Sequence, residues 1–153
     1  MGQRNSKNLE EDCVFCKIVD KELDAEIVYE DESFVAFRDI KPDAEIHIQL
    51  IPRKHIQDIN ALTCNDIELV EKLKELGKEI IMNQPGDTHK KLATQKFAFH
   101  VPPYNSVNHL HLHCISGRSQ FKTHFTHGKI FPWVMTIDSL LDRLRKEKAE
   151  AET

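Results

Sequence analysis

The alternation of histidine and leucine at His109-Leu110-His111-Leu112-His113 is the strongest constraint on what this chain can fold into. On a β-strand, residues two apart share a face and lie roughly 6–7 Å apart. The pattern therefore predicts a strand over residues 109–115 that carries three imidazoles on one face and turns Leu110, Leu112 and Cys114 into a core. A surface strand with scattered histidines is the plain alternative, and the apolar residues between the histidines argue against it.

Three imidazoles on one face suit two kinds of chemistry. In the first, they bind zinc and leave a fourth position open, as in three-histidine catalytic sites. In the second, one imidazole attacks a phosphorus atom while the others stabilise charge and transfer protons. A neutral imidazole is a competent nucleophile near pH 7. The alternation alone leaves both chemistries open.

The composition narrows the class of protein. A chain of 153 residues with 40% hydrophobic and 30% charged residues is typical of one soluble globular domain. The net charge of −4 argues against nucleic acid as a ligand, and no apolar run is long enough for stable membrane insertion. The N-terminus has no secretory signal, so we expect a cytoplasmic location, with the nucleus as a second one. Gly2 and Ser6 fit the N-myristoylation pattern, but the pattern is short and we expect an unmodified tail.

The order of periodic segments predicts an α+β domain with an antiparallel sheet of about five strands, one long helix and a C-terminal helical extension. The helix should begin at a capping box on Thr63 and end near Gln84, and a polar loop should follow over 85–95. Thr136 or Asp138 should cap the final helix, which carries Leu140, Leu141 and Leu144. The expected strands cover residues 27–29, 34–37, 46–52, 96–101 and 109–115, and the expected divisions are a disordered tail at 1–12, one domain at 13–148 and a charged tail at 149–153.

A second group of candidate ligands begins at Cys13 and Cys16, which the pattern 13–18 places on one helical turn. A Cys-x-x-Cys pair in a reducing compartment binds structural zinc only if two further ligands come from elsewhere. His55, just after a predicted strand, and His109 are the candidates. The alternative is two semi-buried thiols that act as apolar filling.

Four ordered motifs together resemble the histidine triad superfamily over about residues 13–116. They are His109–Ile115, Cys13–Ile18, Phe37–Ile40 and Ile51–His55. Within the superfamily the chain is similar to the Hint branch. The extension from Phe121 onward, with Phe131 and Trp133, resembles the third Hint type.

The resemblance implies a role for each matching residue. His111 would attack the α-phosphorus of an adenylate and form a nucleotidyl-histidine, and His109 would complete the triad. His113 would either donate a hydrogen bond to a phosphate oxygen or protonate the leaving amine, and Ser106 would bind the phosphate or the leaving group. Zinc would be structural, with Cys13, Cys16, His55 and His109 as its ligands. The purine would be walled by Val14, Phe15, Ile18, Phe37 and Ile40, and Asp39 would accept hydrogen bonds from both ribose hydroxyls.

One segment departs from the family pattern. Hint proteins often carry a glycine-rich stretch before the triad, and here residues 100–106 contain Pro102 and Pro103 instead. His100 stands where an asparagine usually contacts the ribose, and Asn105 and Ser106 complete this nucleotide-binding stretch.

The resemblance also implies the activity. We expect hydrolysis of adenosine 5'-phosphoramidates at the α-phosphate, with acyl adenylates such as aminoacyl-AMP as a further substrate class. A dinucleoside polyphosphate hydrolase of the Fhit type and a nucleotide-binding adaptor protein are the alternatives. A homodimer whose sheets continue across the two-fold axis is expected, with the helix from Thr63 beside that axis.

Overall fold

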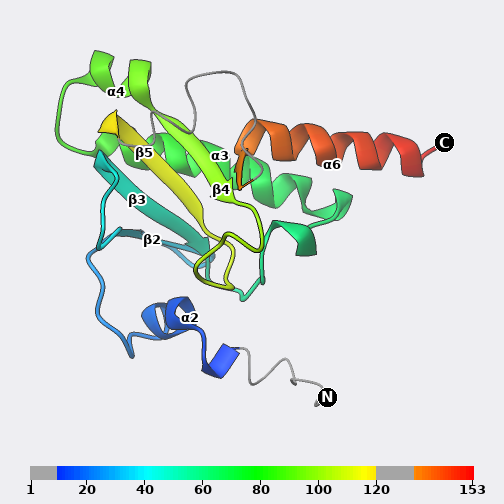
Figure 1. Ribbon diagram of the computed structural model, residues 1–153, viewed down its shortest axis with the longest axis horizontal. Coiled ribbons are helices and arrows are strands. Elements are labelled where there is room, and N and C mark those ends of the chain that lie inside the picture. The colour runs from blue at the N-terminus through cyan, green and yellow to red at the C-terminus, as the bar shows by residue number, and fades with distance from the viewer. Residues whose placement is uncertain (1–9, 120–132) are drawn as a thin grey trace.

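One six-stranded antiparallel sheet organises the computed structural model, which describes residues 10–119 and 133–153 (Figure 1). Every pair of neighbouring strands runs antiparallel, which confirms the predicted sheet. The spatial order of the strands is β1 (Ile27–Glu30), β2 (Phe34–Arg38), β3 (Ala44–Pro52), β5 (Leu112–Ser119), β4 (Lys96–His100) and β6 (Val134–Thr136).

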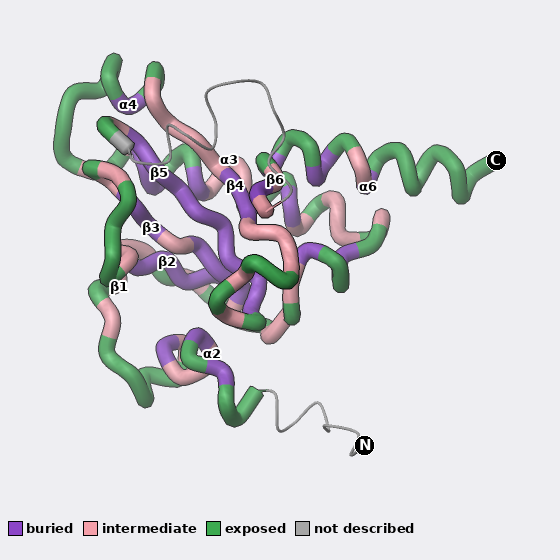
Figure 2. The backbone as a smooth tube through the Cα atoms, in the orientation of Figure 1, coloured by how far each residue is buried: buried purple, intermediate pink, exposed green. Residues whose placement is uncertain are grey.

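Helices α3 (Ile67–Asn83) and α6 (Ile137–Ala151) pack on one face of this sheet and on each other (Figure 1). Their apolar side chains meet alternate residues of the strands, among them Leu50, Leu112 and Cys114, in the first of two cores. Figure 2 shows that most residues of the central strands β2, β3 and β5 are buried. Leu110, Leu112 and Cys114 therefore do face a core, as the alternation predicts.

The short helix α2 (Val14–Val19) belongs to a second, smaller core. This core is formed on the strand residues that alternate with those of the first core. Phe15 and Ile18 of α2 pack there with Val35 and Phe37 of β2. Consecutive side chains of a strand point to opposite faces, so β2 contributes to both cores and its first four residues are all buried. The second core thus attaches the N-terminal segment to the sheet face that carries the histidines.

The predicted helix ends are confirmed. Thr63 and Asp66 form a reciprocal capping box at the start of the 3-10 turn η2 (Cys64–Asp66), from which α3 continues to Asn83 with Gln84 as its C-cap. A second 3-10 turn, η1 (Ile59–Ala61), precedes it. Thr136, rather than Asp138, caps α6 through a hydrogen bond from the Ser139 backbone amide. Leu140, Leu141 and Leu144 are buried.

The polar loop expected over residues 85–95 is wrong, because helix α4 (Thr88–Thr94) forms within it. Asp87 caps this helix by accepting a hydrogen bond from the Lys90 backbone amide at 2.7 Å. Apolar residues do not recur at helical spacing in α4, and Lys91 is its buried residue. The Lys91 Nζ atom donates to the carbonyls of Met82 and Gln84 at the end of α3. A buried cation at a helix C-terminus is invisible to a search for apolar periodicity.

The strand predicted over 109–115 is displaced, since β5 runs from Leu112 to Ser119. Residues 109–111 precede the ladder because the Leu110 amide donates to the carbonyl of Ile56, outside the sheet. The sheet also has one strand more than expected, because β6 pairs with β4 through Phe99 and Met135. Three-residue strands leave too little alternation to be recognised in a sequence.

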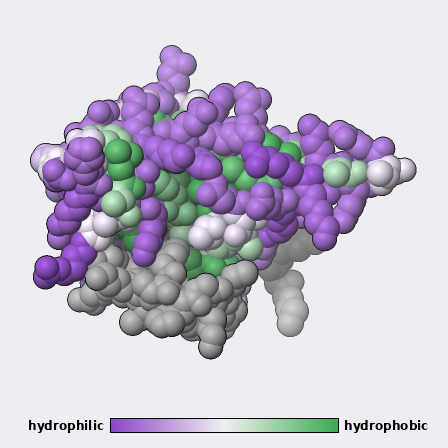
Figure 3. Space-filling view, turned by 90° about the horizontal axis from the view of Figure 1, so that it is seen from above, coloured by the Kyte–Doolittle hydropathy of each residue, from purple (hydrophilic) through white to green (hydrophobic). Residues whose placement is uncertain are grey.

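The expected ends of the domain also shift. Residues 149–151 are not a separate tail but the last turn of α6, and Glu10 begins a helical turn that accepts a hydrogen bond from the Cys13 amide. Gly2, Phe121 and Phe131 lie outside the described residues. Seen from above, most of the described surface is hydrophilic, with small hydrophobic areas between the charged side chains (Figure 3). Among the described helices, none has the length and apolarity to cross a bilayer.

Candidate active site

His109 differs from the other two triad histidines in its hydrogen-bond partners. It is fully buried, and its Nε2 lies 2.8 Å from the carbonyl oxygen of Pro52. A carbonyl oxygen only accepts, so Nε2 carries the ring proton and Nδ1 keeps its lone pair. That lone pair faces the sulfur atoms of Cys13 at 3.5 Å and Cys16 at 3.4 Å. His109 is thus oriented towards the two thiols.

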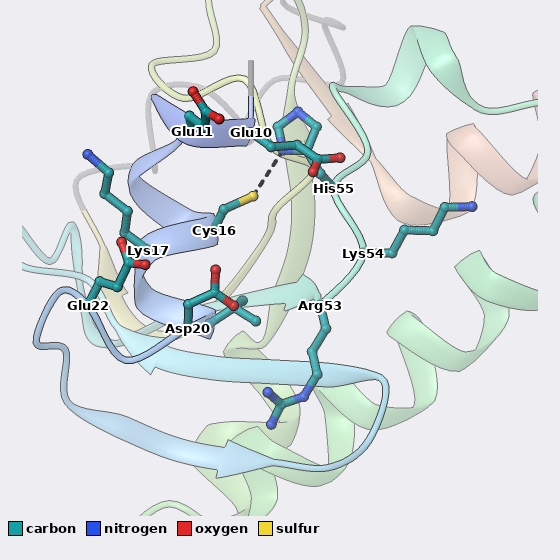
Figure 4. A pocket seen from close by; sticks show the side chains of 10 residues that line it. Glu10, Glu11, Cys16, Lys17, Asp20, Glu22, Arg53, Lys54 and His55 are labelled. Atoms are coloured by element: carbon teal, nitrogen blue, oxygen red, sulfur yellow. Dashed lines mark hydrogen bonds between the residues drawn. The ribbon is translucent and has the colours of Figure 1, made fainter. Parts of the chain in front are cut away.

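His55 joins the same group and completes what we name the Cys–His cluster: Cys13, Cys16, His55 and His109. The Nδ1 atom of His55 lies 3.2 Å from the Cys16 sulfur (Figure 4). One ligand atom from each of the four residues lies within 4.8 Å of the others. The N-terminus of α2, the corner after β3 and the segment before β5 therefore bring together the four side chains that the sequence could only nominate as ligands.

His111 has the opposite tautomer. It is 5% exposed, and its Nδ1 lies 2.6 Å from the carbonyl oxygen of His109, to which it must donate. The Nε2 atom therefore keeps its lone pair. The ring packs edge-on against Phe15, with centroids 5.2 Å apart. This backbone hydrogen bond fixes an imidazole with a nucleophilic Nε2.

His113 is oriented by a residue that the sequence analysis missed, His47 on the neighbouring strand β3. The backbone amide of Asp43 donates to His47 Nδ1 at 3.0 Å, which leaves the His47 proton on Nε2. That Nε2 lies 2.9 Å from His113 Nδ1 and donates to it. His113 then carries its own proton on Nε2. His109 and His113 thus carry their ring protons on Nε2, whereas His111 carries its proton on Nδ1.

These assignments decide between the two chemistries that the alternation left open. A ring nitrogen from each of His100, His111 and His113 lies within 4.8 Å of the others, so a three-imidazole group exists, with His100 in the place of His109. A metal ion needs a lone pair from every ligand, and the hydrogen bond from His47 places a proton on His113 Nε2. The geometry therefore favours a free nucleophile over a three-histidine metal centre.

Burial favours the neutral form of the buried histidines of this site. It lowers the pKa of His109 to about 4 and lowers the pKa of His111 below its ordinary value. It lowers the pKa of His113 further, helped by the repulsion of His111, and lowers that of His47 against the opposing effect of Asp39. Neutral imidazoles are the forms that attack phosphorus or accept a metal ion at pH 7.

Burial acts in the opposite direction on the Cys16 thiol. Together with its hydrogen bond to Cys13, it raises the pKa of Cys16 to about 12. Without a metal ion, the Cys16 thiol is therefore protonated at neutral pH.

Two of the residues expected to wall a purine, Phe15 and Phe37, pack against each other. Phe15 and Phe37 lie edge to face with centroids 5.2 Å apart, and Ile18 packs beside them. Val107, which the sequence did not single out, packs against the same cluster from the loop before the triad. Val14 and Ile40, expected in this wall, are 45% and 93% exposed. Ile40 lies beyond the end of β2 and Val14 opens α2, so neither joins the aromatic pair.

Asp39 lies next to His47 and His113 and is only 12% exposed at its side chain. One carboxylate oxygen accepts from the Lys41 amide at 2.8 Å, and the other accepts from the Gln49 side chain at 2.6 Å. The second oxygen is also 3.5 Å from His47 Nε2. Gln49 lies opposite His113 in the β3–β5 register. Asp39 and His113 are thereby linked through one polar network.

The loop between β4 and the triad holds the remaining candidates. His100 ends β4, and its ring packs edge-on against His113 with centroids 4.6 Å apart. The Asn105 side chain donates to the side chain of Asn108 at 3.1 Å, and Ser106 is exposed. Trp133 accepts a backbone hydrogen bond from Val101 and so joins the C-terminal extension to this loop.

A hollow of about 530 Å³ lies away from His111 (Figure 4). Cys16 and His55 line it, together with four acidic and three basic side chains, and the three triad histidines do not. The hollow therefore opens the Cys–His cluster to solvent rather than forming the catalytic pocket. A smaller hollow is lined by His111 together with His100, Asn105 and Val107.

His47 and Gln49 contact residues of the candidate site, and the sequence analysis missed both of them. Their signal was present: they alternate with the buried residues Ile48 and Leu50 along β3, as the triad histidines alternate with leucine. What the sequence could not reveal is that β3 pairs with β5, which sets Gln49 opposite His113.

Comparison with known proteins gives consistent results. The family model described as "Scavenger mRNA decapping enzyme C-term binding" matches residues 12–127. The chain is 34% identical to adenosine 5'-monophosphoramidase HINT3 of Mus musculus, over 95% of this chain and 88% of that protein. It is 38% identical to the bifunctional adenosine 5'-phosphosulfate phosphorylase/adenylylsulfatase HINT4 of Arabidopsis thaliana, over 68% of this chain and 69% of that protein.

A solved structure agrees with the sequence comparisons. The HIT family hydrolase from Legionella pneumophila superposes with a TM-score of 0.64 at 35% identity, and the match covers 71% of this chain and 95% of that one. The sheet, the placement of the triad and these relatives lead to one assignment. The chain belongs to the histidine triad superfamily and, within it, to the Hint branch.

Proposed function

We propose that this chain hydrolyses adenosine 5'-phosphoramidates through a covalent nucleotidyl intermediate on His111, with acyl adenylates as a further substrate class. The observation that carries the proposal is the hydrogen bond from His111 Nδ1 to the His109 carbonyl, which leaves a lone pair on Nε2 in a neutral, buried ring. The relatives named adenosine 5'-monophosphoramidase HINT3 support the substrate class.

The reaction has two displacements at phosphorus. In the first, His111 Nε2 forms a bond to the α-phosphorus, and the P–N bond breaks with its electron pair going to the leaving amine, which also takes up a proton. In the second, water attacks the same phosphorus, the P–His111 bond breaks, and AMP leaves while the imidazole returns to its neutral form. In-line positioning and stabilisation of charge on the phosphoryl oxygens supply most of the catalysis in such transfers.

The nucleoside would be held on the same sheet face. Phe15 and Phe37 offer an apolar wall to the purine, and Asp39 offers carboxylate lone pairs to the ribose hydroxyls. A mostly apolar cleft with a few oriented polar groups is the usual form of a nucleotide site. His100 and Asn105, beside the smaller hollow, and the exposed Ser106 are placed to meet the phosphate or the leaving group.

We further propose that the Cys–His cluster holds a structural zinc ion. Two thiols and two imidazoles are a common ligand set for structural zinc, and His109 already turns an unprotonated Nδ1 towards both sulfur atoms. When bound, zinc would stabilise the fold by linking α2 to the corner after β3. Through His109 it would also hold the carbonyl that orients the nucleophile His111.

The homodimer and the cytoplasmic or nuclear location stay predictions, as does the absence of nucleic acid as a ligand. For the homodimer, the order of the described strands limits which of them could pair with a second copy. One edge of β4 pairs with β5 and the other with β6, so a sheet that continues into a second copy would have to use β1 or β6.

The test of the proposed activity is release of AMP from an adenosine 5'-phosphoramidate by the purified chain. His111→Ala should reduce kcat by several orders of magnitude, as deletion of a covalent nucleophile does in other enzymes. The exposed His89, on α4, provides the control His89→Ala, which should leave turnover unchanged. Turnover of His111→Ala within tenfold of the unsubstituted chain would contradict the proposal.

A further inference from the structure

The hollow in Figure 4 gives the two sulfur atoms of the Cys–His cluster unequal access to solvent. Cys16 and His55 line this hollow of about 530 Å³ and are partly exposed. Cys13 is 6% exposed and is not among the lining residues. One water molecule occupies roughly 30 Å³ of the liquid, so the hollow has room for a small solute. Cys16 is therefore the cluster thiol that such a solute meets first.

The Cys13 sulfur is held close to that of Cys16. Cys13 is the N-cap of α2, and its sulfur accepts a hydrogen bond from the Cys16 backbone amide at 3.3 Å. The two sulfur atoms lie within 4.8 Å of each other. A Cys-x-x-Cys pair at the start of a helix is the arrangement in which disulfide oxidoreductases make and break their disulfide. The first turn of α2 thus combines an accessible sulfur with a second, buried sulfur beside it.

The same turn carries a residue of the proposed nucleotide site. Phe15 stands between the two cysteines in the sequence and packs edge to face against Phe37. Helix α2 is attached through the second core and through the contacts of its cysteines with His55 and His109. A helix of six residues is not stable by itself in water, so its position depends on these attachments. Loss of the cluster contacts should therefore loosen Phe15.

We propose that the Cys13–Cys16 pair is a site of reversible oxidation by hydrogen peroxide, and that the disulfide dismantles the metal site and loosens the nucleotide site. The second part rests on the proposed zinc and nucleotide sites, whereas the disulfide can be tested without either. A cysteine that binds zinc is a thiolate, which is the nucleophilic form. A disulfide offers no thiolate, so oxidation leaves His55 and His109 as two ligands of the four that structural zinc needs.

The oxidation proceeds in two displacements. In the first, the Cys16 thiolate attacks a peroxide oxygen, an S–O bond forms, the O–O bond breaks, and the departing hydroxide takes up a proton to become water. In the second, the Cys13 thiolate attacks the Cys16 sulfur, the S–S bond forms, the S–O bond breaks, and a second hydroxide leaves as water. The two sulfur atoms lose two electrons, which reduce one peroxide to two waters. An added dithiol reverses the reaction by thiol–disulfide exchange.

The site of oxidation is tested by treating the zinc-loaded full chain with hydrogen peroxide. Peptide mapping after the free thiols are blocked should find one disulfide, between Cys13 and Cys16, and a chromogenic chelator should detect one zinc ion released per disulfide. A diketone that traps sulfenic acids should label Cys16 during the oxidation, and this label should accumulate in Cys13→Ser. If Cys13→Ser does not fold, trapping in the unsubstituted chain identifies the first sulfur to react.

Two cysteines outside the cluster provide the controls. Cys64→Ser should release zinc as the unsubstituted chain does, because Cys64 is not part of the cluster, and the fully buried Cys114 should stay unlabelled. First trapping at Cys13 or Cys64, or release of zinc without the Cys13–Cys16 disulfide, would overturn the proposal.

The effect on the nucleotide site is measured as the Kd for AMP before and after oxidation. The Kd should rise about tenfold, the factor expected if α2 keeps its place in roughly one molecule in ten, and dithiothreitol with zinc chloride should restore it. The reduced, chelator-treated chain should show a smaller rise, because its thiols still contact His55 and His109. An unchanged Kd after complete disulfide formation would overturn the link to the nucleotide site. If the reduced chain binds neither zinc nor AMP, those two proposed sites are wrong, while the peptide map still confirms or refutes the disulfide.

Discussion

Asp39→Asn should strongly reduce the preference for ribose over 2'-deoxyribose while preserving the shape of the side chain. In the structure, the two carboxylate oxygens of Asp39 accept one hydrogen bond each, from the Lys41 amide and from the Gln49 side chain. A carboxylate offers about four lone-pair sites, so roughly two remain for the ribose hydroxyls. Asparagine has one acceptor oxygen in place of two, and its NH2 group would face either Lys41 or Gln49 as a second donor.

The magnitude follows from the charge and burial of this carboxylate. A hydrogen bond to a charged group contributes about 1.5–3 kcal/mol, which corresponds to roughly a 10- to 150-fold preference for the substrate that keeps its 2'-hydroxyl. The side chain is 12% exposed, so water replaces a missing hydroxyl poorly. We expect the unsubstituted chain to show a preference in this range and Asp39→Asn to reduce it to about threefold or less.

The assay compares kcat/KM for an adenosine phosphoramidate and its 2'-deoxy analogue in each variant. Because the ratio is taken within one variant, any loss of folded protein cancels. Asp43→Asn is the matched control, since it makes the same change of charge at an exposed side chain and leaves the Asp43 backbone amide in place. Equal discrimination by Asp39→Asn and the unsubstituted chain would mean that the sugar is held elsewhere, and His100 would then be the residue to substitute.

Three further predictions concern the metal, acid and core packing. Elemental analysis should find one zinc per chain, which Cys16→Ser should lose and Cys64→Ser should keep; equal zinc in both variants would contradict the assignment. The zinc affinity should rise with pH, because the Cys16 thiol must lose its proton to bind the metal. In chelator-treated protein, the free energy of unfolding should fall as the pH drops from 6.5 towards 4, because His109 takes up its proton at a higher pH in the unfolded state than in the folded state. Denaturation midpoints that stay constant over this pH range would refute the effect of burial on His109. Leu140→Ala should destabilise the fold by about 2–5 kcal/mol in denaturant, whereas Leu92→Ala, at a site 54% exposed, should change stability little; equal effects would contradict the core of α6.

Periodicity predicted the parts of the fold in which one residue pattern repeats over several turns or strand positions. Helix α3 was recognised because its capping box and its apolar spacing agree, and the alternation around His111 assigned the correct face to each side chain. Helix α4 and strand β6 were missed for a physical reason. Both are short. Helix α4 is held by the buried Lys91 and strand β6 by pairing with the distant strand β4, and neither contact leaves a local apolar pattern in the sequence.

The candidate site shows the same division. The residue types needed for zinc and for nucleophilic attack were identified from the sequence, because their spacing within a motif is itself the signal. The division of labour among the triad histidines was not visible there. It depends on the Pro52 carbonyl, on the His109 carbonyl and on His47, which stands 66 residues from its partner His113. Hydrogen bonds of this kind are set by the register of β3 and β5 and cannot be read from composition or periodicity.

The most direct test of the central claim is to trap the intermediate on His111. The chain is mixed with excess adenosine phosphoramidate or acyl adenylate, quenched during a single turnover, and digested under conditions that preserve phosphohistidine. Mass spectrometry should then find one adenylyl group on the peptide that contains the triad, assigned to His111, and no adduct in His111→Ala. Turnover without any adduct in a time course that resolves the first turnover, or an adenylyl group on His109, His113 or His100, would contradict the account.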